Sequence, residues 1–236
     1  MATILNIETA TDICSVALES DGDILFDRIS SGNATHAALI GPFIDEALKK
    51  AKSEGKTIEA VAVSSGPGSY TGLRIGASAA KGVCFGLNVP LIAIKTLEIL
   101  TTSAIRLNNK KDCLYCPMID ARRMEVYAAV FDNCLNEIRT TQADVVTADT
   151  YASFLKDREV CFFGNGAAKC QETIDSENAV FLPDVQPLAS EMVLLAEQAF
   201  NEKQFENVAY YDPFYLKEFH ATIAKNKVLG AVGKNN

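Results

Sequence analysis

The chain has 236 residues, of which 48% are hydrophobic, so it can build a core and suits one large domain or two lobes of about 100 residues each. Thirty acidic residues against 22 basic ones give a formal net charge of −8, which argues against autonomous binding to a nucleic-acid backbone. The sequence contains no apolar run of about 18 residues and enters a strand pattern at Thr3, so we expect no membrane span, no secretory signal and a cytoplasmic location.

The first half of the chain alternates strand and helix patterns in the order βββαβαβα. Apolar runs predict strands, and apolar residues at helical spacing from His36 onward predict a helix that Thr35 caps and that ends near Gly55. The expected strands cover 3–8, 13–19, 24–29, 60–64 and 89–94, and the expected later helices cover 71–86 and 97–107.

A glycine-rich turn, Ser64 to Gly76, joins a buried strand to a helix. Such turns often bind phosphate, because bare backbone N–H groups and a helix N-terminus converge there. A Walker loop needs Lys after its last glycine, where this chain has Leu73, and a dinucleotide fingerprint needs glycine at 71, where it has Thr71. The turn therefore matches neither of these motifs.

The polar stretch 108–112 is the best candidate for a lobe boundary, giving lobes of 1–107 and 108–236. Beyond it we expect strands at 114–119, 124–131, 137–146 and 160–163, and helices at 150–155 and 190–200. The last of these helices is a candidate to complete the first lobe, and the tail from about residue 228 is expected to be disordered. Because both halves begin with three strands, the element order favours a duplicated two-lobe architecture.

Seven cysteines are an odd number, and most lie in apolar runs, which favours small buried hydrophobes in a reducing compartment. Cys113-Leu114-Tyr115-Cys116 is a single CxxC with no second pair and no nearby histidine, so a zinc site is not expected.

Catalytic motifs are not readable in the sequence. The chain has two histidines, and the position one helical turn after His36 is Ile40, so no H-x-x-x-H metal pair exists. No G-x-S-x-G elbow is present either.

The sequence leaves open whether the chain has a nucleotide site. Turns after the first strand of each half, and the turn 164–167, could bring carboxylate, hydroxyl and glycine together, and the alternative is that these are ordinary tight turns. The candidate cofactor-binding residues are Glu8, Thr9, Asp120, Gly164 and Gly166.

The helix after the glycine-rich turn is small on several faces. Each interior glycine costs about 1 kcal/mol of helix stability relative to alanine, so close approach by another helix is expected. That approach is either packing inside the lobe or a subunit interface, and both can hold at once. In the interface interpretation, Gly76→Leu leaves the fold largely intact and weakens association.

Three segments together resemble the bacterial TsaB (YeaZ) family: Ile4 to Thr11, Ser64 to Gly76, and Asp120 to Tyr127. The ending Asp212-Pro213-Phe214-Tyr215-Leu216-Lys217 is similar to the close of that family. The resemblance implies a two-lobed actin/Hsp70/sugar-kinase-like (ASKHA) fold of class α/β, with mixed sheets flanked by helices.

The resemblance also implies a function. Members support the synthesis of N6-threonylcarbamoyladenosine (t6A) in tRNA as a non-catalytic scaffold for the transferase TsaD, with the ATPase TsaE as a further partner. No cofactor is required, ATP or ADP has a place in the interlobe cleft, and tRNA is met only through the complex. The first two helices would form the partner interface, and an isolated chain is expected to use it for a homodimer. The interface residues are His36, Ile40, Phe43, Ala47, Gly72, Arg74, Gly76 and Ala80.

Two enzyme hypotheses compete with this one. A magnesium-dependent ATPase or small-molecule kinase would use the same cleft and lose turnover on Asp120→Ala. A glycoprotease-like metallopeptidase is disfavoured because the chain lacks a metal-ligand set.

Overall fold

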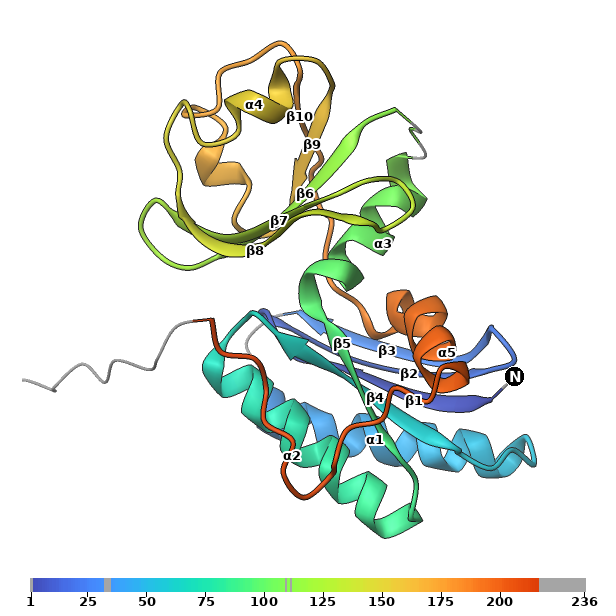
Figure 1. Cartoon of the computed structure of the whole chain (residues 1–236). Coiled ribbons are helices and arrows are strands. Elements are labelled where there is room, and N and C mark those ends of the chain that lie inside the picture. Colours follow the sequence, from blue (N-terminus) through green and yellow to red (C-terminus); the bar gives the residue numbers. More distant parts are fainter. Residues whose placement is uncertain (1, 32–34, 109, 111, 217–236) are drawn as a thin grey trace, which may run out of the picture.

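The computed structural model describes residues 2–31, 35–108, 110 and 112–216, which form two lobes joined by a long helix (Figure 1). Each lobe contains a five-stranded sheet with both parallel and antiparallel pairs. The tail from residue 228, expected to be disordered, lies outside the described residues.

The first sheet has the strand order β3-β2-β1-β4-β5. Its strands are β1 (Thr3–Glu8), β2 (Ile13–Ser20), β3 (Asp23–Ser31), β4 (Ala60–Gly66) and β5 (Leu91–Lys95). β1 and β4 are buried at every position, as expected for central strands covered on both faces.

The second sheet repeats this topology. Its order is β8-β7-β6-β9-β10, with β6 antiparallel to β7 and parallel to β9. The strands are β6 (Leu114–Asp120), β7 (Glu125–Phe131), β8 (Glu137–Val145), β9 (Val160–Phe163) and β10 (Ala179–Phe181). The shared order confirms the two-lobed ASKHA-like architecture with mixed sheets.

Helices cover the first sheet on both faces (Figure 1). On one face α1 (His36–Ser53) and α2 (Tyr70–Leu87) bury Ile44 and Ala80 against Leu5 and Val63. On the other face α5 (Val193–Asn201) and the 3₁₀ turn η2 (Ala189–Met192) bury residues such as Met192 against strands β1 and β4. The small side chains of α2, among them Ala77 and Ala80, let this helix pack closely against the first sheet.

α3 (Thr96–Asn108) connects the lobes. Its Ile99 packs into the cluster under the first sheet, whereas Leu100 and Ala104 pack against Tyr115 and Phe163 of the second sheet. The far face of the second sheet is covered by α4 (Ala152–Leu155) and the 3₁₀ turn η1 (Ala168–Cys170), which contribute Leu155 and Cys170 to its core. Both sheets therefore share one helix as part of their cores.

The chain returns to the first lobe with η2 and α5 and stays on it beyond α5. Glu206 N donates to Leu91 O at 2.8 Å, Tyr211 is buried in the first core, and Phe214 N donates to Ser65 O at 2.7 Å. We name residues 205–216 the return segment; Figure 1 shows it in red, crossing the first lobe beside β5 and α2. The expected lobe boundary at 107/108 stays a prediction.

Some expected elements differ in extent. The helix expected at 150–155 is the single turn α4, the helix expected at 190–200 begins as η2, and the three-residue strand β10 was not expected. Within the described part of the chain, no helix is both long enough and apolar enough to span a bilayer.

Candidate functional site

A cleft lies between the lobes, where the glycine-rich turn of the first faces the β6–β7 turn of the second. It has a volume of about 550 Å³. One wall carries Asp12, Gly68 and Ser69, the opposite wall carries Asp120 and Asn165, and the return segment forms the rim. The ends of β1, β4, β6 and β9 therefore lead to one place, as the duplicated topology requires.

Glu8, at the end of β1, is fully buried beside this cleft rather than exposed in it. Its Oε1 accepts a hydrogen bond from Ala10 N at 2.5 Å, and its Oε2 has no partner among the described residues. Burial raises the pKa of the Glu8 carboxyl to about 8, and the hydrogen bond from Ala10 lowers it by a smaller amount. A carboxyl that is largely protonated at neutral pH is a poor ligand for magnesium.

Thr9 is fully buried and interlocks with α2. Its Oγ1 donates to Gly72 O at 2.9 Å, and its N–H donates to Ser64 Oγ at 3.3 Å. A β-carbon on Gly72 would meet Thr9 O, and one on Gly76 would meet Thr9 Oγ1. The N–H groups of Thr9 and Ala10 therefore donate to protein oxygens, and the β1–β2 turn packs directly on the start of α2.

In the glycine-rich turn, Gly68 is required because the turn packs closely against the β1–β2 turn. A β-carbon on Gly68 would meet Ala10 O, which also accepts from Ser69 N at 2.7 Å. Ser69 caps α2 by accepting from Gly72 N at 3.2 Å. At the start of α2, the N–H groups of Ser69 and Gly72 are therefore engaged by the neighbouring turn and by the helix cap.

Asp120 lines the cleft, but its carboxylate is engaged. Oδ1 pairs with the ammonium of Lys169 and accepts from Arg122 N at 3.0 Å. Lys169 also donates to the carbonyl oxygens of Arg123 and Glu125, at 2.7 Å each. An ammonium therefore already occupies the place beside Asp120 where a bound cation would lie.

Gly164 and Gly166 lie under the end of β6. Gly164 has φ +92°, and a β-carbon there would meet Met118 O at 2.5 Å. Gly166 N donates to Met118 O at 2.9 Å. Asn165 between them reaches the cleft, where its Oδ1 accepts from Asp120 N at 2.9 Å. Asn165 lies in the turn 164–167 but was not predicted as a site residue, and Lys169 belongs to no motif; both meet Asp120 across more than 40 residues of sequence.

The predicted interface residues divide into two groups. Five are buried inside the first lobe: Ile40, Ala47, Gly72, Gly76 and Ala80. Three are accessible at least in part: His36, Phe43 and Arg74. His36 Nε2 lies 3.0 Å from Ile13 O, and Arg74 Nη1 donates to Tyr70 OH at 2.9 Å.

The prediction for Gly76, in the small-residue stripe of α2, needs a correction. We expected Gly76→Leu to leave the fold largely intact, but Thr9 Oγ1 fills the space such a side chain needs. The glycines serve packing inside the lobe, against a turn rather than a helix. The outward face of the helix pair is formed by other residues. They include Ala37, Ala38 and Gly41 of α1 and Thr71, Ser78, Gly82 and Phe85 of α2.

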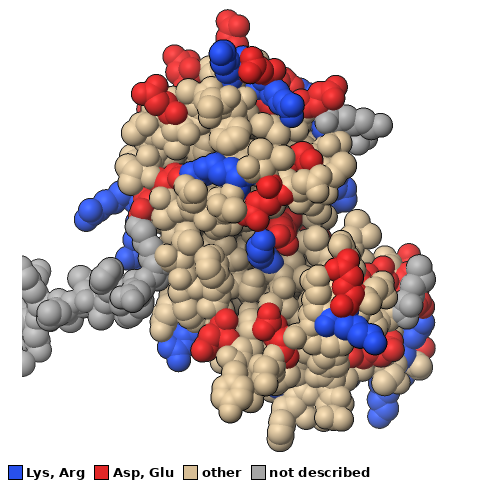
Figure 2. All heavy atoms as spheres, viewed as in Figure 1, with Lys and Arg blue, Asp and Glu red and all other residues tan. Residues whose placement is uncertain are grey.

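Charge on the face drawn in Figure 2 is mixed. Acidic and basic side chains of the described residues are interspersed there, and no broad basic area forms. Nucleic acids bind best to continuous basic surfaces. This face therefore lacks the electrostatic character of a nucleic-acid site.

Comparisons with known proteins agree with the topology. A sequence model of the family described as TsaD, tRNA N6-adenosine threonylcarbamoyltransferase, matches residues 30–225. The Escherichia coli (strain K12) tRNA threonylcarbamoyladenosine biosynthesis protein TsaB is 31% identical over 221 residues, covering 91% of this chain and 94% of that protein. The Bacillus subtilis (strain 168) protein of the same name is 30% identical over 176 residues, covering 73% and 75%.

Among solved structures, YeaZ from Pseudomonas aeruginosa superimposes with a TM-score of 0.76 at 24% identity, covering 92% of this chain and all of that one. A second Pseudomonas aeruginosa structure, titled as an uncharacterized protein with similarity to peptidase YEAZ, gives a TM-score of 0.80 at 23% identity and the same coverage. These two matches support the fold.

Proposed function

This chain belongs to the TsaB (YeaZ) family, and from that premise we propose that it is a non-catalytic subunit of t6A biosynthesis that binds and stabilises a TsaD-like transferase. The partner role in tRNA modification follows from the family. That the chain performs no chemistry of its own, and that it binds TsaD directly, are the proposal.

The state of the two cleft carboxyls carries the non-catalytic part. Glu8 is buried beside the cleft with a raised pKa, and Asp120 in the cleft is paired with Lys169, so neither of these two candidate carboxyls is available to hold a metal ion and its phosphate. No group of three or more His, Cys, Asp or Glu side chains in the described residues is arranged to hold a metal ion. In this proposal the cleft is a vestigial nucleotide site, and it is where ATP or ADP would bind. The scaffold function itself requires no cofactor.

The outward face of α1 and α2 is the surface we propose for TsaD. Small residues dominate it, and β-carbons added at Gly41 or Gly82 would meet nothing within 4 Å. Phe85 near the end of α2 is 88% exposed. Small residues let helices of a partner approach closely, and an exposed aromatic side chain is a common anchor. Without its partner, the same face would pair two copies of this chain.

Co-purification tests the proposal. The tagged chain is expressed with the TsaD-like protein of its own genome, and the product is weighed by size-exclusion light scattering, with and without ATP and a TsaE-like protein. We expect a stable heteromer that forms t6A on tRNA when the threonylcarbamoyl adenylate is supplied, whereas the chain alone binds tRNA weakly. A chain that stays alone under every nucleotide condition would overturn the partner role.

The competing kinase or ATPase hypothesis is tested in the same preparation. It requires magnesium-dependent ATP turnover by the isolated chain that Asp120→Ala abolishes. The ion pair between Asp120 and Lys169 argues against the kinase or ATPase hypothesis, because it engages the carboxylate that would hold magnesium. The metallopeptidase hypothesis lacks ligands, because Ile40 stands one helical turn after His36 and is buried.

A further inference from the structure

Two buried cysteines of the second lobe lie in contact, away from the cleft. Cys113 precedes β6, Cys161 is on β9, and their Sγ atoms are 3.4 Å apart. Tyr115 lies opposite Cys161 in the parallel register, so Cys113, two residues earlier, shares its face one diagonal step away. Elsewhere in the described chain, no two sulfur atoms are in hydrogen-bond contact.

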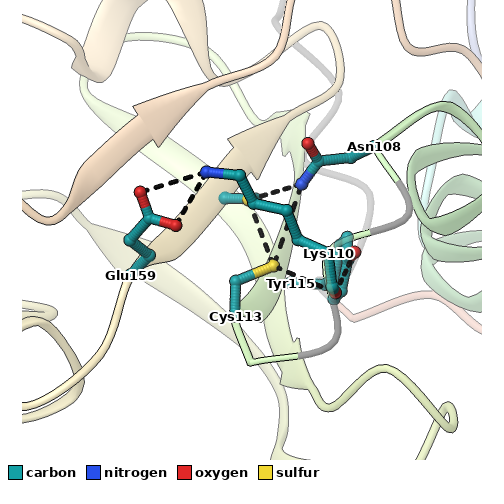
Figure 3. A network of polar contacts seen from close by, with 6 residues as sticks. Asn108, Lys110, Cys113, Tyr115 and Glu159 are labelled. Carbon is teal, nitrogen blue, oxygen red and sulfur yellow. Dashed lines mark hydrogen bonds and ion pairs between the residues drawn. The ribbon is translucent and has the colours of Figure 1, made fainter.

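The surroundings of the two sulfurs are polar for a protein core, as Figure 3 shows. Asn108 Nδ2 donates to Cys161 Sγ at 3.2 Å and lies 3.8 Å from Cys113 Sγ. Lys110 O accepts from Tyr115 OH at 3.0 Å and lies 3.7 Å from Cys113 Sγ. An amide donor directed at sulfur stabilises electron density there, which a purely hydrophobic cysteine does not need.

The pair is covered by side chains that are weakly held. Lys110 Nζ pairs with Glu159 at 2.8 Å, and the two side chains are 48% and 41% exposed. Exposed ion pairs contribute little to stability, so this cover opens readily to a small molecule. Cys113, outside the strand and 3% exposed, is reached before Cys161, which is 0% exposed.

The backbone arrangement sets a condition on a bond between them. Diagonal neighbours in a sheet lie about 7–8 Å apart, and a disulfide prefers Cα atoms within about 6.8 Å. The backbone at Cys113 must therefore move toward β9 by on the order of 1 Å. Because Cys113 belongs to the connection from α3 rather than to β6, that movement leaves the sheet register in place.

We propose that Cys113 and Cys161 form a reversible dithiol–disulfide pair that reacts with peroxides. Hydrogen peroxide oxidises the Cys113 thiol to a sulfenic acid and releases one water. The Cys161 sulfur then attacks the Cys113 sulfur, the S–OH bond breaks, and a second water leaves with the Cys161 proton. Two thiols and one peroxide thus give one disulfide and two waters, and an added dithiol reverses the reaction.

Burial explains why Cys161 reacts only after Cys113 has been oxidised. It raises the pKa of the Cys161 thiol to about 12, so Cys161 stays protonated and is not the thiol that peroxide oxidises first; its proton passes to the departing hydroxide when it attacks Cys113. The bond would tie the start of β6 to β9 at the point where the chain leaves α3. Oxidation would therefore fasten the α3–β6 connection to the second sheet.

Peptide mapping of the full chain tests this proposal. Cys134→Ser removes the exposed thiol that would otherwise join two copies. The protein is treated with graded hydrogen peroxide, its remaining thiols are alkylated in denaturant, and it is digested with trypsin without reduction. We expect a mass loss of about 2 Da and a link between peptides 112–122 and 159–169, both reversed by dithiothreitol.

Peptide 112–122 also contains Cys116, so a matched variant is needed. The link should persist in Cys116→Ala and disappear in Cys113→Ala and Cys161→Ala. A link that requires Cys116, full alkylation of both thiols after oxidation, or only irreversible sulfinic acid at Cys113 would each overturn the proposal. The wild-type mass map decides the matter even if one of these variants does not fold.

Discussion

Thr9 Oγ1 occupies the space that a β-carbon on Gly76 would need, and the same hydroxyl donates to Gly72 O at 2.9 Å. Thr9 therefore sets the identity of two positions on α2, Gly76 through its hydroxyl and Gly72 through its backbone carbonyl. Gly76→Ala should lower the free energy of unfolding by about 1–3 kcal/mol, as overpacking does in a filled core.

The matched control is Gly82→Ala on the same helix. A β-carbon there meets nothing within 4 Å, so this change should stabilise the protein by about 0.5–1 kcal/mol. Urea unfolding measures both variants. Thr9→Ala should relieve part of the loss at Gly76, and if Gly76→Ala costs the same in both backgrounds, the contact is not its cause.

Glu8→Gln should change how stability depends on pH. Burial raises the pKa of Glu8 to about 8 from an ordinary value of 4.5, so between these values the folded state keeps a proton that the unfolded state has lost. The wild-type free energy of unfolding then falls as pH rises through this window. The variant cannot ionise, so its advantage should grow from near zero at pH 4.5 to about 2–4 kcal/mol at pH 8. Parallel profiles from urea titrations would contradict the assignment.

Arg139→Ala should strongly destabilise the second lobe. Its guanidinium makes a bidentate pair with Asp144 at 2.6 and 2.8 Å, and Tyr151 OH donates to the same carboxylate at 2.8 Å. Because Asp144 is only 7% exposed, removing Arg139 leaves a buried charge and should cost about 3–5 kcal/mol.

Two milder changes calibrate that result. Tyr151→Phe removes one hydrogen bond and should cost about 1 kcal/mol. Lys49→Ala breaks an exposed pair with Asp45 and should leave the stability of the protein nearly unchanged. A loss at Arg139 no larger than the loss at Lys49 would show that the pair is not stabilising.

Asp120→Ala should leave t6A formation by the assembled complex within about twofold of the wild type, since a barrier change of about 0.4 kcal/mol has that effect. The reason is that the carboxylate serves Lys169 and the β6–β7 turn rather than a substrate. Radiolabelled threonine incorporation into tRNA measures the rate. A drop of a hundredfold with unchanged assembly would return Asp120 to a catalytic role.

Ser78→Trp should weaken association with the TsaD-like protein by at least about tenfold, or 1.4 kcal/mol. Ser78 is exposed on the outward face of α2, so the indole obstructs a partner without disturbing the core. Ser153→Trp, exposed on α4 of the other lobe, is the control for a surface tryptophan. Equal affinities of the two variants in calorimetry would exclude this face as the docking surface.

Apolar runs and helical spacing predicted most of the fold, because buried strands and helix faces show these patterns in the sequence. The strands near 3–8 and 60–64, and the helix near 71–86, lie where the pattern placed them. β10 was missed because three residues are too few to show a period. That the two sheets share one strand order could be established only from the pairing of the strands, because the two halves show no sequence repeat.

The site was less predictable, because a pattern shows that a residue is buried and not what it is buried against. Gly72 was singled out correctly as a place of close approach, but its neighbour, Thr9, is 63 residues away. Lys169 likewise meets Asp120 across 49 residues. Such pairings depend on the assembled topology, and no local spacing encodes them.

The return of the chain to the first lobe bears on the order in which the protein is made. Met192, Ala196 and Tyr211 complete the cores on the two faces of the first sheet, yet all three follow the whole second sheet in the sequence. A nascent chain that has passed residue 188 has every strand of both sheets but lacks this cover. The lobe synthesised first must therefore finish folding last, and until then its apolar surface is the part of the newborn protein that a chaperone would protect.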